Sequence, residues 1–341
     1  MRNPVRPRAL MALPLLLALL PISLLLGLGI GTSGAGWSDL PGLWNDDADP
    51  VVRQILIDVR LPRVLLAALV GAALAAAGVA YQGVLRNPLA DPFILGVSGG
   101  SALGAVLFGA AAGATSLGVL GRPAAGFGGA LVTLFLLFRL ARLGGRTGPT
   151  TLLLVGVVLN AIASALILFV ITAGDPARFQ GEFFYLIGRI PPQPLSTLLA
   201  IAIWLALGLA VLATQSHRLN LLALGEDAAG QLGVDPERSM WITVLAASLV
   251  TAAAVAFTGL VGFVGLIVPH IVRTLLGPDH RILLPCATLA GASFLVLADS
   301  AARVVAAPVE IPVGVLTTLI GGPFFLVLFL RHLREEGGAV G

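Results

Sequence analysis

The sequence predicts an all-α, polytopic membrane protein with about ten transmembrane helices, from its composition, the length of its apolar runs and the placement of its arginines. Hydrophobic residues make up 57% of the 341 residues and charged residues only 11%, with a mean hydropathy of +1.00. Ordinary soluble domains carry about 25% charged residues. A chain this apolar and this poor in charge is expected to be embedded in lipid.

Apolar runs of membrane-spanning length recur along the whole chain. Nine runs contain no Asp, Glu or Arg, and they occupy residues 9–38, 64–85, 92–121, 123–138, 147–174, 190–217, 239–272, 282–298 and 311–330. A helical span needs about 20 apolar residues. The run 239–272 is too long for one helix, because at about 1.5 Å per residue it would exceed the hydrocarbon core by roughly 20 Å. The stretch 258–262 (Thr-Gly-Leu-Val-Gly) offers a break, which gives ten spans.

The arginines favour ten spans with both termini in the cytoplasm. All twenty basic residues are arginine, and cytoplasmic loops of membrane proteins carry an excess of positive charge. Ten spans place 13 arginines inside and 7 outside, whereas nine spans divide them 10 to 10. The residues that change sides between the two counts are Arg273, Arg281, Arg303, Arg331 and Arg334.

The chain is expected to form one transmembrane domain over residues 1–341. Arginines precede the first apolar run, as in a signal peptide, but its apolar part exceeds the usual length of about 7–15 residues, so a retained first span is favoured. The aspartate-rich segment 39–58 is expected to lie on the outer side of the membrane.

Composition also excludes several kinds of chemistry. The chain has no lysine, and a phosphate-binding loop needs one, so this chain is not expected to bind ATP in such a loop. Its single cysteine, Cys286, excludes an intramolecular disulfide and a cysteine metal cluster. No histidine pair has metal-ligand spacing, and we predict no metal or cofactor site in this chain. The arginines are scattered at the ends of spans, so no nucleic-acid partner is expected.

One polar segment interrupts the apolar runs. Residues 218–238 (RLNLLALGEDAAGQLGVDPER) carry four acidic residues between two long runs. A structured polar loop of this kind is expected to face a soluble partner. Gly225 is predicted to permit a turn that a side chain would obstruct, and Glu226 is predicted to act as a capping or docking acid.

Short motifs over about residues 50–331 resemble, in order, the ABC permeases for iron-siderophores, haem and cobalamin (the FecCD/BtuC type). In the first half the motifs are RLPR at 60–63, QG at 82–83, NPLADP at 87–92 and LGVSGG at 95–100. In the second half they are ALGE at 223–226, GFVGLIVPH at 262–270, DHR at 279–281, LAD at 297–299 with Arg303, EIPVG at 310–314 and GGP at 321–323. The segment 185–190 (YLIGRI) departs from the pattern, because relatives more often carry Met-Gly-Ser-Leu there.

This resemblance implies a permease of the type II ABC importer fold in the inner membrane. Such an importer combines two permease copies, two cytoplasmic ATP-binding subunits and an extracytoplasmic substrate-binding protein. ATP and Mg would bind the partner ATPase, so this chain is expected to be a transport subunit and not an enzyme. Residues 218–238 would then form the cytoplasmic coupling loop. Its predicted ATPase contacts are Leu224, Gly225, Glu226, Ala228, Leu232 and Gly233.

The resemblance also assigns residues at the outer face and along the path. Arg60, Arg63 and Arg303 are predicted to receive acidic residues of the binding protein as exposed docking charges, the alternative being that they reach lipid headgroups. Gly156 and Asn160 of the fifth span are predicted to line the translocation path, and packing between helices is an equal alternative for Asn160.

Two other classes of protein stay open at this stage. An ion-coupled secondary transporter would use an intramembrane carboxylate, for which Asp299 is the candidate. Asp299 could equally form a local salt bridge with Arg303, one helical turn later. A membrane enzyme would need a convergent set of catalytic residues, and none is recognised. The motifs do not distinguish iron-siderophore, haem and cobalamin as cargo. A homodimer is favoured over a pair of paralogous permeases.

Overall fold

The computed structural model describes residues 5–32, 34–41, 49–112, 121–143, 148–174 and 176–338. Over these ranges the chain is helical and contains no strand, which confirms the predicted all-α class. Ten long helices correspond to the ten predicted spans. They are α1 (Val5–Gly29), α3 (Leu61–Val84), α4 (Val97–Ala112), α5 (Gly121–Leu143), α6 (Pro149–Ala173), α8 (Leu195–Leu222), α10 (Pro236–Thr258), α11 (Val264–Leu276), α12 (His280–Val304) and α13 (Val313–Gly338).

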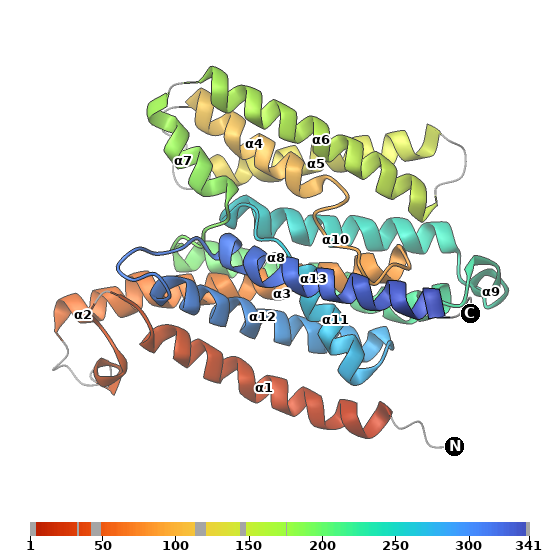
Figure 1. Cartoon of the computed structure of the whole chain (residues 1–341), viewed down its shortest axis with the longest axis horizontal. Helices are drawn as coiled ribbons and strands as arrows, with labels where there is room; N and C mark the ends of the chain where they lie inside the picture. Colours follow the sequence, from red (N-terminus) through yellow and green to blue (C-terminus); the bar gives the residue numbers. More distant parts are fainter. Residues whose placement is uncertain are drawn as a thin grey trace.

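The helices differ in how fully they could cross a bilayer alone. Seven helical segments in the described ranges are long and apolar enough to span a membrane, whereas α4, α11 and the apolar part of α13 are shorter. Most of the long helices run side by side along one common direction, whereas α11 is tilted away from it (Figure 1). The start of α1, the end of α13 and the short α9 (Glu226–Gln231) lie at one end of the molecule, and α2 (Pro50–Gln54) and α7 (Pro176–Leu186) lie at the other (Figure 1).

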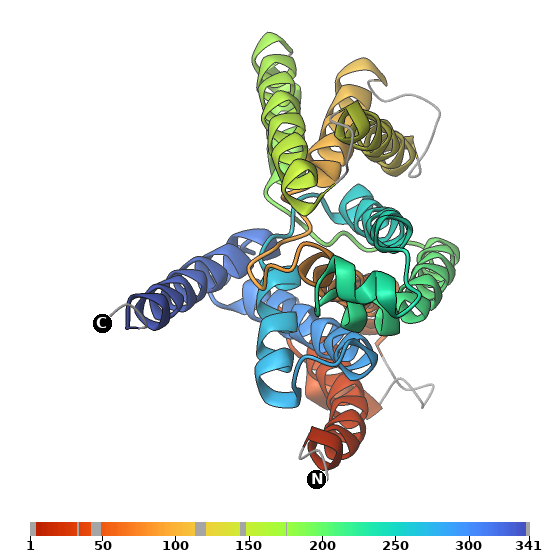
Figure 2. The same ribbon diagram turned by 90° about the vertical axis from the view of Figure 1, so that its right-hand side faces the viewer.

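The centre of the fold is α3, which is almost wholly buried. It packs against α8, α10, α11 and α12, while α1 covers α12 from outside. A second group, α4, α5 and α6, joins the first through α10. Viewed along the helices, α6 and α13 project from the centre in different directions (Figure 2). The close approach of α3 and α12 depends on Gly71 and Gly291, since a Cβ on either would collide with the backbone of the other helix.

The predicted break in the run 239–272 is confirmed. Helix α10 ends at Thr258, and α11 begins at Val264. Gly259 has φ +69° and Phe263 has φ +67°, so the chain leaves one helix and enters the next through left-handed backbone. The start of α10 is also encoded locally, because Asp235 accepts a hydrogen bond from the Arg238 N–H and Pro236 occupies the first turn.

The described residues 49–58 of the predicted outer segment are more regular than their composition suggests. Asp49 caps α2 by accepting from the Val51 N–H, and α2 continues through a π-helical turn, η3 (Ile55–Arg60), into α3. The whole stretch Pro50–Val84 is a continuous apolar helix of 35 residues. At about 1.5 Å per residue this exceeds a hydrocarbon core of about 30 Å, so one end is expected to extend beyond the lipid.

Candidate functional site: an outer arginine cluster and a polar helix at the opposite end

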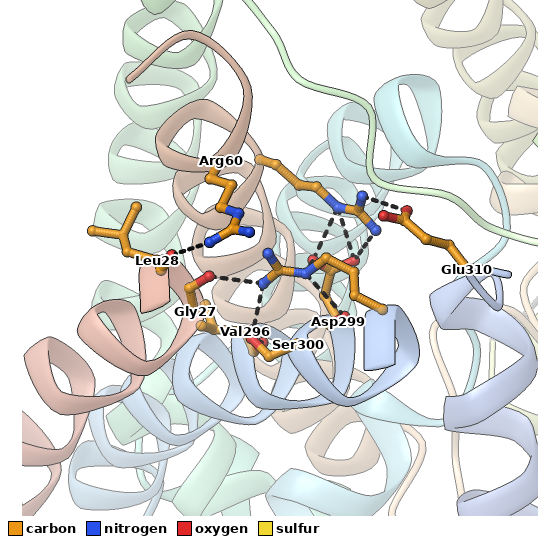
Figure 3. Close-up of polar contacts among 9 residues, drawn as sticks. Gly27, Leu28, Arg60, Val296, Asp299, Ser300 and Glu310 are labelled. Atoms are coloured by element: carbon orange, nitrogen blue, oxygen red, sulfur yellow. Dashed lines mark hydrogen bonds and ion pairs between the residues drawn. The ribbon is translucent and has the colours of Figure 1, made fainter. Parts of the chain in front are cut away.

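Five charged side chains meet at the end of the molecule that carries α2, and we call them the arginine cluster. Arg60 ends η3, Arg63 lies in the first turn of α3, Asp299 and Arg303 lie in the last turns of α12, and Glu310 lies between α12 and α13. Figure 3 labels Arg60, Asp299 and Glu310, which come together from three separate segments. Ion pairs join Arg63 to Asp299, which lies 236 positions away in the chain, and to Glu310, which lies 247 positions away.

Asp299 is the centre of the cluster. Its carboxylate accepts two hydrogen bonds from Arg63, at 3.0 Å from Nε and 2.9 Å from Nη2. Arg303 Nε lies 3.3 Å from Oδ2 of the same carboxylate, the oxygen that also accepts from Arg63 Nε. The third nitrogen of Arg63, Nη1, donates to Glu310 at 2.8 Å. One carboxylate therefore holds two guanidinium groups, and the bidentate geometry fixes the orientation of Arg63.

The other two arginines reach the end of α1. Arg60 Nη1 donates to the Leu28 carbonyl at 2.9 Å, and Arg303 Nη2 donates to the Gly27 carbonyl at 2.9 Å. The last carbonyls of a helix have no partner within the helix and carry partial negative charge. The two cations satisfy these carbonyls and so join α1 to α3 and α12 (Figure 3).

The structure corrects the prediction that these arginines are exposed. Arg60 is 3% exposed and Arg303 is 2% exposed, because both are covered by the end of α1, and neither can reach lipid headgroups. Arg63 is 11% exposed and its partner Glu310 is 34% exposed, so this pair forms the accessible edge of the cluster. The role of the three arginines in docking a binding protein stays a prediction.

The same contacts bear on Asp299 as an ion-coupling residue. The local salt bridge to Arg303 is confirmed, and Arg63 adds a second and better aligned partner. A carboxylate that is 1% exposed and shared by two arginines is not available to exchange a proton or a sodium ion with the solvent. Its contacts favour a structural role.

The predicted polar loop forms the short helix α9 at the opposite end of the molecule. Gly225 precedes α9 with φ +113°, and Gly233 follows it with φ +81°. A Cβ at Gly225 would meet no atom within 4 Å. The constraint on Gly225 is therefore its backbone conformation, which confirms the prediction that glycine permits a turn that a side chain would obstruct.

The loop presents apolar side chains to solvent. Leu224 is 66% exposed and Leu232 is 59% exposed, while Ala229 between them is buried against the rest of the protein and Ala228 is half-buried. Glu226 forms a salt bridge of 2.9 Å with Arg86, which follows the end of α3 and has φ +49°. Beside this pair lies a cleft of about 400 Å³. The loop is thus connected to the central helix and carries two uncovered leucines.

The two predicted path residues pack against α4. A Cβ on Gly156 would approach the Leu95 Cα to 2.7 Å, so glycine is required for this helix to lie against the turn before α4. Asn160 is half-buried, and its side-chain oxygen faces Gly99 of α4. These contacts support the packing alternative for Asn160 and show a packing role for Gly156, and the path assignment of both residues stays a prediction.

Several polar contacts involve residues for which the sequence indicates no partner. Gln82 accepts from Arg273 Nη2 at 2.9 Å, and the Asn220 side chain joins Asp279 at 2.6 Å to His280 Nδ1 at 2.7 Å. These residues are far apart in the chain, so a motif search finds the members but not the pairs. Arg122 and the buried Glu182 of α7 also pair, and no short motif marks them.

Known proteins resemble this chain in both sequence and fold. The family model described as the FecCD transport family matches residues 19–331. The cobalamin import permease BtuC of Halobacterium salinarum is 44% identical over 82% of this chain and 74% of its own length. The hemin transport permease HmuU of Yersinia pestis is 38% identical over 99% of this chain and all of its own. A solved structure of a metal-chelate-type ABC transporter, in an inward-facing conformation, has a TM-score of 0.81 at 35% identity, covering 95% of this chain and 99% of that one.

Ten helices with α3 at their centre define a multi-pass membrane permease of the ABC-importer type. The chain belongs to the FecCD transport family, whose model spans nearly all of it.

Proposed function

We propose that this chain is the membrane-spanning subunit of a binding-protein-dependent importer that carries a metal chelate across the inner membrane. ATP hydrolysis takes place on a separate ATPase subunit, where ATP and Mg bind. The observation that carries this proposal is α9, a short helix flanked by two exposed leucines at the same end as both termini. Family membership and the absence of lysine from the chain support it.

The α9 loop is the proposed contact with the ATPase. Exposing leucine side chains to water is unfavourable, and covering them with a partner protein contributes favourable free energy to binding. Leu224, Gly225, Glu226, Ala228, Leu232 and Gly233 are the proposed coupling residues. Movement of this loop would reach α3 through the Arg86–Glu226 salt bridge.

A second copy of the chain is the proposed partner along α6 and α13. Both helices expose large apolar side chains, including Phe169 at 67% and Leu319 at 65%. Lipid can cover such faces, and so can an identical subunit. The family resemblance favours an identical subunit. The translocation path would then lie between the two copies, and Gly156 and Asn160 would lie on the helix that lines it.

The arginine cluster is the proposed contact with the extracytoplasmic binding protein. Arg63 and Glu310 form its accessible edge, while Arg60 and Arg303 hold the edge in place from behind. Exposed charge pairs mainly speed and orient association and weaken with salt. For the cargo, relatives named for cobalamin and for hemin support a chelate of the iron-siderophore, haem or cobalamin type.

Exchange of the exposed leucines tests the coupling role. Replacing Leu224 and Leu232 by Ser together should abolish the stimulation of the purified ATPase subunit by the permease, because the covered apolar surface is lost. The matched control exchanges Val305 and Val309 for Ser, which are 65% and 68% exposed at the other end of the molecule. Equal stimulation by both double variants in proteoliposomes would contradict the proposal.

A further inference from the structure

The end of α8, just before the coupling loop, is joined to the start of α12 by one side chain. The Asn220 amide nitrogen donates to the Asp279 carboxylate at 2.6 Å, and the amide oxygen accepts from the His280 backbone N–H at 2.9 Å and from His280 Nδ1 at 2.7 Å. The first N–H groups of a helix have no partner within it. Asn220 therefore caps α12 from another helix, beside Asp279, which caps it from the preceding position. We call these three residues the α8–α12 joint.

The joint fixes which nitrogen of the His280 ring carries the proton. A carboxylate only accepts and a backbone N–H only donates, so the Asn220 amide can face its two neighbours in one orientation. Its oxygen is then the atom that faces Nδ1, which must carry the ring proton. The other ring nitrogen, Nε2, is buried and has no hydrogen-bond partner among the described residues. A Cβ on Gly83, near the end of α3, would lie 2.6 Å from Nε2, so α3 packs directly against this ring.

The joint lies close to the coupling loop along the chain. The backbone N–H groups of Leu224 and Gly225 each donate to a carbonyl three residues earlier, at 3.0 and 3.1 Å. The stretch from Asn220 to α9 therefore consists of hydrogen-bonded turns, and a displacement of α9 is expected to carry Asn220 with it. The His280 ring is 5% exposed and contacts both α3 and α8, so movement of Asn220 is passed on to it.

Helices α12 and α3 extend from the joint to the arginine cluster at the opposite end of the molecule. Helix α12 begins at His280 and carries Asp299, and α3 carries Arg63, which is paired with Asp299 at 2.9 Å. Between these ends Gly71 and Gly291 bring the two backbones together, with no space for a Cβ on either. The two helices are thus fixed to each other and can move as one body.

We propose that Asn220 is a positioning residue that passes movement of the coupling loop, through His280, to the α3–α12 pair and so to the arginine cluster. This role rests on the proposed function of α9 and goes beyond it, because it connects the ATPase contact to the outer end. The Arg86–Glu226 salt bridge also reaches α3, but its side chains are 35% and 55% exposed. Exposed ion pairs hold a geometry weakly, whereas the joint has three hydrogen bonds, one of them to a charged group, around a buried ring.

A fluorescent label at the outer end measures this transmission. Val309 is 68% exposed and precedes Glu310, the partner of Arg63, and the only cysteine of the chain, Cys286, is 1% exposed. A Val309→Cys variant can therefore be labelled with bimane at one site. The labelled full chain is reconstituted with its ATPase subunit in proteoliposomes, and its emission is compared with and without ATP and vanadate. With Asn220 in place, ATP should change the emission.

Asn220→Leu keeps the branched shape of the side chain and removes the three hydrogen bonds. It should reduce the ATP-dependent change about fivefold, the lower end of typical couplings between sites, while the ATPase subunit stays bound through the exposed leucines. The matched control is Gln215→Leu on the same helix, since the hydrogen bonds of the Gln215 amide with Thr214 and Arg218 stay within α8. This control should leave the emission change intact.

Two exchanges of His280 separate transmission from packing. The amide nitrogen of an Asn side chain can take the place of Nδ1, so His280→Asn keeps a donor for Asn220 and should retain the emission change. His280→Leu fills more of the space but has no donor, and it should lose the change as Asn220→Leu does. His280→Asn also removes the atom that Gly83 faces, so it should restore the stability that Gly83→Ala loses in equilibrium unfolding.

An emission change of full size in Asn220→Leu, or equal changes in His280→Asn and His280→Leu, would overturn the role of the joint. So would an unaltered joint that binds the ATPase subunit but gives no emission change with ATP. If the ATPase subunit does not bind the unaltered chain at all, the proposed function of α9 is refuted, and the role of the joint with it.

Discussion

Replacing Asp299 by Asn should destabilise the folded protein far more than neutralising Glu310 in the same cluster. Asp299 is 1% exposed and is the shared acceptor for Arg63 and Arg303. Asn keeps one acceptor oxygen but removes the charge, which leaves the 2%-exposed Arg303 with no counter-ion at hydrogen-bond distance among the described residues. Breaking a buried pair by removing one partner costs about 3–5 kcal/mol. Because one oxygen remains, we expect about 3 kcal/mol, the lower end of that range.

Equilibrium unfolding in detergent, followed by the fluorescence of the four tryptophans, measures this loss. The control is Glu310→Gln, which removes the charge of the 34%-exposed partner of Arg63 and should cost about 0–1 kcal/mol. A double-mutant cycle of Asp299→Asn with Arg303→Gln should give a coupling energy of about 0.5–3 kcal/mol. If the Asp299→Asn and Glu310→Gln variants have equal unfolding free energies within error, the cluster does not stabilise the fold in the way its geometry indicates.

Two further predictions concern helix packing and pH. Gly156→Val should destabilise the protein by about 1–3 kcal/mol, because a Cβ there would lie 2.7 Å from the Leu95 Cα, whereas Gly128→Ala, where a Cβ meets nothing within 4 Å, should be tolerated in the same unfolding assay. Burial raises the pKa of Asp91 from 3.8 to about 6, even though the Phe93 N–H donates to its carboxylate at 2.8 Å. The folded state therefore holds this proton more tightly than the unfolded state, and the stabilisation is complete below about pH 4 and lost as the pH rises through about 6. Asp91→Asn should remove up to about 3 kcal/mol of that pH dependence, and an unchanged slope of unfolding free energy between those pH values would contradict it.

The sequence predicts the helices well because each is encoded locally. Apolar runs of membrane length set the number of spans, and Gly259 divides the longest run where the structure divides it. Asp235 and Asp279 cap the helices that follow them, a signal contained within three residues. Arginine placement likewise predicts the side of each loop, since it requires no knowledge of the tertiary contacts.

The segment 39–58 shows the limit of this reasoning. Its aspartates predict a polar outer region, but the helix through Pro50–Val84 is continuous because Asp49 and Pro50 start it well before the apolar run begins. Gly225 is a similar case. Its sequence context indicates a turn, and the structure confirms the turn while assigning the need for glycine to φ and not to crowding.

The sequence by itself determined the all-α class, the ten helices and the family motifs, and it singled out Arg60, Arg63, Asp299 and Arg303 but neither Glu310 nor Arg86. Only the tertiary structure decided that Arg60 and Arg303 are buried against the end of α1 and that Arg63 and Glu310 remain accessible. The physical reason is that exposure and pairing depend on which helix ends meet, and the two acidic partners of Arg63 lie more than 200 residues away from it in the chain. A motif records that an arginine is present, but the carbonyls and carboxylates around it are supplied by other helices.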